Sequence, residues 1–219
     1  MTDLPGGRPP GSGDPAAREL LLQRARRLEY FTVGWNLVEG LVAVGAAIAA
    51  GSVALLGFGI DSFVESASAF VLIWRLGAEG RAVDHHAIEP LDRRAHQLVG
   101  VSLFALAAYI AVDAVWTLYH RTQPKPSIIG IAVLLISIGV MMWLARAKRS
   151  AARALASRAM EADAFQTTAC WWLSIIGLAG IGLNSAFGWW WADPGAAIGM
   201  GALLVREGRE AWHGEDCCT

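Results

Sequence analysis

The sequence predicts an all-α integral membrane protein, a bundle of six transmembrane helices with both termini in the cytosol. Hydrophobic residues make up 55% of the 219 positions and charged residues only 17%, whereas soluble domains carry about one quarter charged residues. The second observation is a series of long charge-free runs, and the third is the gathering of Lys and Arg on alternate connections between them. The net charge of −1 gives no indication of nucleic acid as a partner.

The apolar segments account for most of the chain, and most are near the ~20 residues that cross a hydrocarbon core. Only Gly51 and Ser52 join the first two, which predicts a tight helical hairpin. Before the sixth segment lies FGWWWADP, in which the tryptophans suit an interfacial belt and Asp-Pro suits a helix start. The six segments are roughly 29–50, 52–75, 97–119, 127–146, 163–184 and 192–206, the last extending as a helix toward residue 212.

The ends of the chain are expected to lie outside the helical bundle. The first 17 residues are rich in Pro and Gly and lack an apolar core, which predicts disorder and no cleavable signal. We expect residues 1–27 to form a disordered or amphipathic cytosolic segment and 28–212 the transmembrane domain, with 213–219 as a short tail. Three cysteines, Cys170, Cys217 and Cys218, make no disulfide framework.

Basic residues set the predicted orientation. With both termini on one side of the membrane, that side collects sixteen of the eighteen Lys and Arg residues. The opposite side holds only Arg121 and Lys125. Because cytosolic loops carry the excess of positive charge in membrane proteins, both termini are predicted to be cytosolic.

The second apolar segment carries two acidic residues, Asp61 and Glu65, near its middle. An acidic group at the centre of a membrane helix costs about 3 kcal/mol on insertion scales, so the pair costs roughly twice that. Four residues apart on a helix, their side chains lie on one face. A structural, hydrogen-bonded pair would need one carboxyl group kept protonated, because adjacent carboxylates repel. We interpret the pair as a site for a divalent cation or for protons.

The fifth segment carries a polar stripe at the spacing i, i+3, i+4 and i+7, formed by Asp163, Gln166, Thr167 and Cys170. Taken alone, Gln166 or Cys170 is compatible with ordinary interior packing. Opposite Asp61 and Glu65, the stripe is a candidate second half of a metal site. Counted from the helix ends, Cys170 is level with Glu65, whereas Gln166 lies about 6 Å nearer the cytosol.

Further polar residues leave alternatives open. Glu39 in the first segment, with Asn36 one turn before it, serves as a counter-charge, a packing group or a proton relay. Asp113 in the third segment is interpreted as an interfacial or water-facing carboxylate.

The connection from the second to the third segment is rich in His and acidic residues, which either hold a cytosolic metal loosely or form a solvated loop. Cys217 and Cys218 suit a soft-metal capture pair or a lipidation point. The residues of the connection are Asp84, His85, His86, Glu89 and His96.

Three stretches resemble the cation diffusion facilitators. GSVALLGFGIDSFVE is similar to the second helix of that family, where two aspartates four residues apart supply half of the transport site. SRAMEADAFQTTAC resembles the start of the fifth helix, and ADPGAAIGMGALLVREGREAW resembles the sixth. The resemblance runs from about Leu28 to Trp212 and includes the six-span topology with cytosolic ends.

Carried over residue by residue, the resemblance implies that Asp61 and Glu65 stand on the two aspartates. Ala162 and Asp163 fit the usual lead-in of the fifth helix, which places Gln166 on the usual His and Cys170 on the usual Asp. Glutamine is a weak neutral oxygen ligand, whereas a cysteine thiolate is strong and favours softer metals such as Zn²⁺. Asp163 is expected to lie at the entrance to the site or to contact the residues that bind the metal.

The resemblance further implies a short family member without the cytosolic metal-binding domain that commonly supports the dimer. A homodimer would then rest on membrane contacts, for which the small residues Gly195, Gly199 and Gly201 are candidates. The implied partners are the lipid bilayer, protons and a divalent metal as cargo, with no prosthetic group.

The implied function is secondary active export of a divalent transition metal, Zn²⁺ first and Mn²⁺, Fe²⁺, Co²⁺, Ni²⁺ or Cd²⁺ as alternatives, by metal/proton antiport rather than enzymatic catalysis. Asp61, Glu65 and Cys170 must lose protons to bind a dication, so metal and protons compete for them. One alternative is a non-transporting membrane metal sensor or assembly partner with an incomplete site. Another is a small-molecule drug/proton exporter that uses the same carboxylates.

Overall fold

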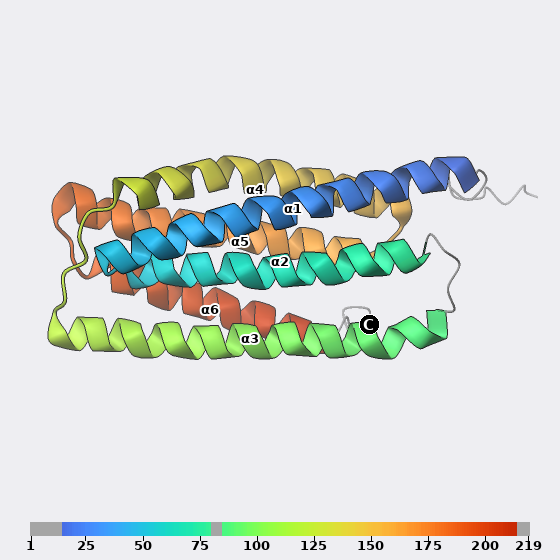
Figure 1. Ribbon diagram of the computed structural model, residues 1–219. Helices are drawn as coiled ribbons and strands as arrows, with labels where there is room; N and C mark the ends of the chain where they lie inside the picture. The colour runs from blue at the N-terminus through green and yellow to red at the C-terminus, as the bar shows by residue number, and fades with distance from the viewer. Residues whose placement is uncertain (1–14, 80–84, 214–219) are drawn as a thin grey trace, which may run out of the picture.

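The computed structural model describes residues 15–79 and 85–213, which form six antiparallel helices (Figure 1). Within those ranges there is no strand, so the all-α prediction is confirmed. Several helices are longer than the apolar segments that predicted them, because each helix continues past the end of its run of apolar residues. The helices are α1 (Pro15–Ala50), α2 (Val53–Glu79), α3 (His85–His120), α4 (Ile128–Leu155), α5 (Arg158–Phe187) and α6 (Ala192–His213).

Helix α1 differs most from expectation, because it begins at Pro15 and runs without a break through the expected boundary at residue 27. Its added turns are held by packing. Leu22 and Ala25 are buried in a small apolar cluster with Leu72 and Leu76 of α2 and residues of α4 and α5. This early part of α1 therefore belongs to the bundle.

Helices α1 to α5 are each long and apolar enough to cross a membrane, by length and composition. Helix α6 falls short because its last third carries Arg206, Glu207, Arg209 and Glu210. It nevertheless runs beside α3 and α5 within the same bundle (Figure 1). Large apolar side chains cover the outside, with Leu41, Val112, Trp116 and Ile128 among the most exposed. So extensive an apolar surface is typical of contact with lipid, and the chain forms a helical membrane bundle.

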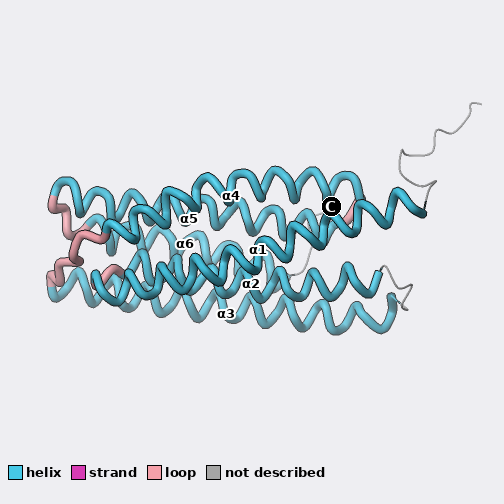
Figure 2. The backbone as a smooth tube through the Cα atoms, turned by 45° about the horizontal axis from the view of Figure 1, so that its top comes forward, coloured by secondary structure: helices cyan, strands magenta, loops and turns pink. Residues whose placement is uncertain are grey.

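The helices are arranged as a group of four and a pair. Helix α1 packs on α2 and α4, and α5 packs on α4 and α2, while α3 packs chiefly on α6. The α3–α6 pair lies against α2 and α5 of the four-helix group. Figure 2 shows the short connections 51–52, 121–127 and 188–191 gathered at one end of the bundle, here named the connection end. The opposite end, where α1 starts and α4 meets α5, is named the terminal end.

The charge asymmetry of the sequence matches these two ends. Arg121 and Lys125, the two basic residues expected on the outer side, lie exposed at the connection end. The loop that carries them is tied down by two hydrogen bonds. The Lys125 N–H donates to the Ala50 carbonyl at 2.7 Å, and Asn184 Nδ2 donates to the Pro124 carbonyl at 2.8 Å.

The predicted hairpin between α1 and α2 turns at Gly51, whose φ of 69° lies in the left-handed region that favours glycine. Asp193 of α6 closes the turn from across the bundle. Its Oδ1 accepts from the Ser52 hydroxyl at 2.5 Å, and its Oδ2 accepts from the Val53 N–H at 3.0 Å. The carboxylate thus caps the N-terminus of α2, where unpaired N–H groups favour a negative charge.

Replacing Asp193 with Ala should lower the free energy of unfolding by about 2 to 4 kcal/mol, because a cap is lost and buried donors lose their acceptor. The change is measurable by circular dichroism during unfolding in mixed detergent micelles. Glu161→Ala is the matched control, since Glu161 is an exposed acid in the first turn of α5 and should cost about 1 kcal/mol or less. Equal losses in the two variants would refute the capping role.

Candidate metal site

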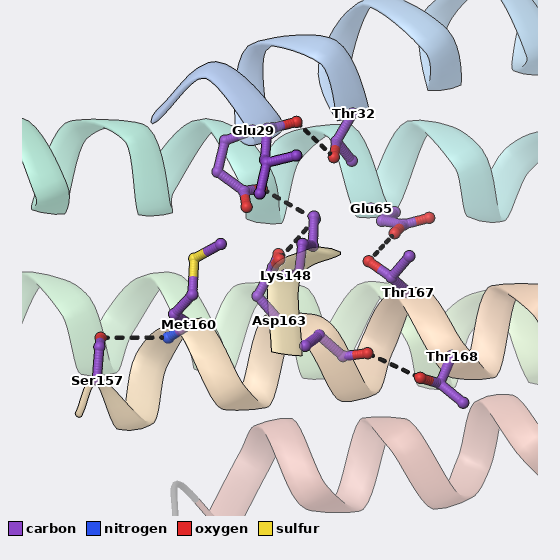
Figure 3. A network of polar contacts seen from close by, with 11 residues as sticks. Glu29, Thr32, Glu65, Lys148, Ser157, Met160, Asp163, Thr167 and Thr168 are labelled. Atoms are coloured by element: carbon purple, nitrogen blue, oxygen red, sulfur yellow. Dashed lines mark hydrogen bonds and ion pairs between the residues drawn. The ribbon is translucent and has the colours of Figure 1, made fainter. Parts of the chain in front are cut away.

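The two acidic residues of α2 lie inside the bundle and face α5. Asp61 is 3% exposed and Glu65 1% exposed. The Thr167 hydroxyl of α5 donates to Glu65 Oε1 at 2.8 Å (Figure 3), and the Cys170 thiol interacts with both carboxyl groups. The expectation that the pair faces the polar stripe of α5 is therefore met for Thr167 and Cys170.

The other two members of that stripe are placed differently. Gln166 is half-buried, and its Nε2 has no hydrogen-bond partner within the described residues. Asp163 lies deeper toward the terminal end and is engaged by Lys148 of α4 (Figure 3). Asp163 is thus bound by a basic partner that sequence reasoning did not identify.

Lys148 joins three helices in a buried ion triad. Its Nζ donates to Glu29 Oε2 of α1 at 3.0 Å and to Asp163 Oδ2 of α5 at 2.5 Å. The Lys148 side chain is fully buried, as are the two carboxylates apart from a small exposed part of Asp163. Such a triad is retained in a low-dielectric interior only because each charge has a close partner.

A second polar stripe runs along the buried face of α1 and consists of Glu29, Thr32, Asn36 and Glu39. The spacing i, i+3, i+7 and i+10 repeats on one helical face, so the sequence contained a signal for it. Glu39 lies near Ser137 of α4 and interacts electrostatically with Glu65 and Asp61. Neither of its carboxylate oxygens has a hydrogen-bond partner within the part of the chain that the structure describes.

Negative charge exceeds positive charge inside the bundle. Among the described residues, seven buried carboxylates accompany one buried ammonium group, that of Lys148. Asp193 is stabilised by the α2 N-terminus, and Glu29 and Asp163 by Lys148. The remaining four have no basic partner of this kind, and an ionised carboxylate in such surroundings needs a cation or a proton. They are Glu39, Asp61, Glu65 and Glu207.

The side chains do not surround an ion as they stand. Among the residues whose side chains the structure describes, which exclude 78–99 and 211–219, no three His, Cys, Asp or Glu groups converge in a metal-binding arrangement. Glu65 directs one oxygen to Thr167, and Asp61 retains an unpartnered Oδ1. Side chains must therefore rotate before three such groups can bind one ion.

The remaining predicted residues lie elsewhere. Asp113 is half-buried near the connection end, where it interacts with Asp193. Asp84, Cys217 and Cys218 lie outside the described residues, as do the side chains of the histidine-rich segment at the start of α3, His85, His86, Glu89 and His96.

The small residues proposed for a dimer contact divide between the inside and the outside of the bundle. Gly201 is buried against the Ala107 carbonyl of α3. Its lack of a side chain therefore allows α6 and α3 of the same chain to pack closely, and does not serve a contact with a second copy. Gly195 is exposed and Gly199 half-buried, which leaves these two for contacts outside the bundle.

Comparison with known proteins shows which protein family the chain matches. The family model described as the cation efflux transmembrane domain matches residues 31–212, a range that includes Asp61, Glu65, Gln166 and Cys170. Among curated proteins, the chain is 28% identical over 187 residues to an uncharacterized transporter of Synechocystis sp.. The aligned region covers 84% of this chain and 60% of that relative, so the chain spans less than two thirds of the relative's length.

The buried triad predicts a large loss of stability when only its cation is removed. Lys148→Met leaves Glu29 and Asp163 buried without a counter-charge and should lower the free energy of unfolding by about 3 to 5 kcal/mol. Replacing all three groups, by Glu29→Gln, Lys148→Met and Asp163→Asn, should recover most of that loss. Unfolding in mixed micelles measures both.

Arg149→Met is the matched control for the triad. Arg149 is the next residue of α4, is exposed and donates to the Thr168 hydroxyl at 3.1 Å, so its loss should cost about 1 kcal/mol. A Lys148→Met variant no less stable than Arg149→Met would show that the triad does not hold the three helices together.

Proposed function

This chain belongs to the cation efflux family, and on that premise we propose that it exports a divalent transition metal, Zn²⁺ first, in exchange for protons. Proteins of this family transport metal ions across membranes and are not enzymes. The observation that carries the proposal is the buried pair Asp61 and Glu65, which faces Cys170 while the buried Lys148 is engaged by two other carboxylates. A divalent cation would supply the missing charge.

The residues have separate roles in this proposal. Asp61 and Glu65 provide anionic oxygens, Cys170 a soft thiolate, and Gln166 an auxiliary oxygen when its amide turns toward the ion. Asp163 is not a direct ligand, because Lys148 occupies it; it positions the terminal end of α5 against α4 and α1. Thr167 orients Glu65 by donating its hydroxyl proton to one carboxylate oxygen.

Exchange with protons follows from the chemistry of the ligands. A carboxylic acid or a thiol binds a dication only after losing its proton, so metal arriving on one side displaces protons and protons arriving on the other release the metal. A site reached alternately from the two membrane faces is the usual arrangement in secondary transporters. The sixteen-to-two distribution of Lys and Arg supports a cytosolic terminal end, from which the metal would enter.

Reconstituted vesicles test the proposal directly. The intact chain should couple metal uptake to proton movement for at least one of Zn²⁺, Mn²⁺, Fe²⁺, Co²⁺, Ni²⁺ and Cd²⁺. Asp61→Ala should reduce the flux to that of protein-free vesicles because a central anionic ligand is lost, while Asp113→Ala, which removes a carboxylate near the connection end, should retain it. Metal flux and internal pH are followed with dyes in the same vesicles.

The outcomes separate the competing functions. Metal binding without movement of metal or protons would favour a sensor or assembly partner and refute export. Proton movement driven by lipophilic cations, with no response to metals, would favour a drug exporter. Full flux in Asp61→Ala would remove the assigned site.

Cys170 should set the preference for soft metals. Cys170→Ser replaces a thiolate with a hard oxygen and should lower the ratio of Cd²⁺ to Mn²⁺ affinity at least about tenfold, or 1.4 kcal/mol. Titration calorimetry of the purified chain measures both affinities. Ser174→Ala, one turn away on the same face, should leave the ratio unchanged; an unchanged ratio in Cys170→Ser would show that the thiol does not bind the metal.

A further inference from the structure

Glu207 is a buried carboxylate that neither the sequence patterns nor the family resemblance assigned to the site. It lies in the last third of α6 and is 6% exposed, between two exposed neighbours on the same helix, Arg206 and Glu210. Those two bind each other on the outside, with Arg206 Nε donating to Glu210 Oε1 at 3.1 Å. Glu207 Oε1 has no hydrogen-bond partner among the described residues.

Charged groups of two helices act on Glu207. Asp61 and Glu65 of α2 lie within electrostatic range of it, as do Glu210 and Arg206 of its own helix. Helix α6 packs directly against α2 and α5, so Glu207 approaches the two carboxyl groups from the α3–α6 pair. The three acidic groups therefore lie on adjacent helices, at the contact of that pair with the four-helix group.

A second unpartnered polar group lies at the same level of the bundle. The Arg206 guanidinium stacks over the Phe165 ring at 5.6 Å, which aligns this part of α6 with the start of α5. The next residue of α5 is Gln166, whose buried Nε2 has no hydrogen-bond partner within the described ranges. Both unpartnered atoms, Gln166 Nε2 and Glu207 Oε1, thus belong to neighbouring turns of α5 and α6.

This arrangement does not fit a purely structural role for Glu207. A buried carboxylate that served packing would be expected to accept hydrogen bonds, because an unsatisfied buried polar group costs about 1 to 3 kcal/mol and a charged one more. Like charges facing one another add to that cost. Glu207 instead keeps an oxygen without a hydrogen-bond partner on a helix that packs against the helix of Asp61 and Glu65, and a cation would stabilise such a set of acids.

We propose that Glu207 is a further ligand of the transported cation, contributed by α6. The proposal rests on the proposed function, because it extends the Asp61 and Glu65 site rather than defining another. The site then takes carboxylates from two bodies, α2 of the four-helix group and α6 of the α3–α6 pair. A cation held by both stabilises the arrangement in which the bodies are close, so binding and release are linked to the contact between them.

Glu207→Gln tests the assignment by cation affinity. Titration of the purified full chain with Zn²⁺ and Mn²⁺ should show affinity at least tenfold weaker than in the unaltered protein, and Glu207→Asp, which keeps the charge on a shorter side chain, should fall between them. Glu210→Gln is the matched control, since it removes an exposed carboxylate one turn away, and it should bind both metals normally.

A measurement on the unaltered chain removes dependence on the folding of the variants. An apolar carbodiimide modifies buried carboxyl groups, and the extent at each residue is read by mass spectrometry of peptides. Zn²⁺ or Mn²⁺ should reduce modification of Glu207 several-fold together with that of Asp61 and Glu65, while modification of Glu210 stays constant.

The two proposals fail in different ways. Absence of metal binding in the unaltered chain would overturn the proposed function and this inference with it. Normal affinity in Glu207→Gln, or unprotected Glu207 beside protected Asp61 and Glu65, would overturn the α6 ligand alone and leave the α2 and α5 site standing.

Discussion

The cost of holding carboxylates inside a membrane bundle is the constraint on which the rest of this structure depends. Hydrocarbon does not solvate an ionised carboxylate, so each buried acid requires a hydrogen-bond donor, a cation or a proton. Asp193 obtains donors from the Ser52 hydroxyl and the start of α2. Glu29 and Asp163 share the ammonium group of Lys148.

The acids that are bound neither by a basic side chain nor by a helix N-terminus define the functional interior. Glu39, Asp61, Glu65 and Glu207 come from three helices and interact with one another electrostatically in overlapping pairs. The satisfied acids hold the ends of the bundle, Asp193 at the connection end and the Lys148 triad toward the terminal end. Structural and functional acids are thus distinguished by their partners rather than by residue type.

How much of this was predictable depends on the range of the interactions. The α2 pair and most of the α5 stripe follow from helical spacing, a local property that sequence reading recovers, and the hairpin at Gly51 follows from its short connection. The sequence places Lys148 in a cytosolic connection, because the fourth apolar segment ends near residue 146. Helix α4 continues to Leu155, which turns that ammonium group into the interior. The polar stripe of α1 has a helical spacing that the sequence shows. Its first member, Glu29, stands at the predicted start of the first segment, whereas the helix itself begins at Pro15.

The sequence by itself determined the number and order of the helices, the asymmetry of basic residues between the two ends, and the presence of paired acids on one face of α2 and of a polar stripe on α5. These depend on hydropathy and helical periodicity, which act over a few turns of chain. Only the tertiary structure decided which charges meet: Lys148 with Glu29, 119 residues apart, and Ser52 with Asp193, 141 residues apart. The approach of Glu207 to Asp61 and Glu65 is of the same kind. Such pairings arise because six packed helices bring one face of each toward a common interior, and no local pattern specifies which residues of distant helices lie at the same depth.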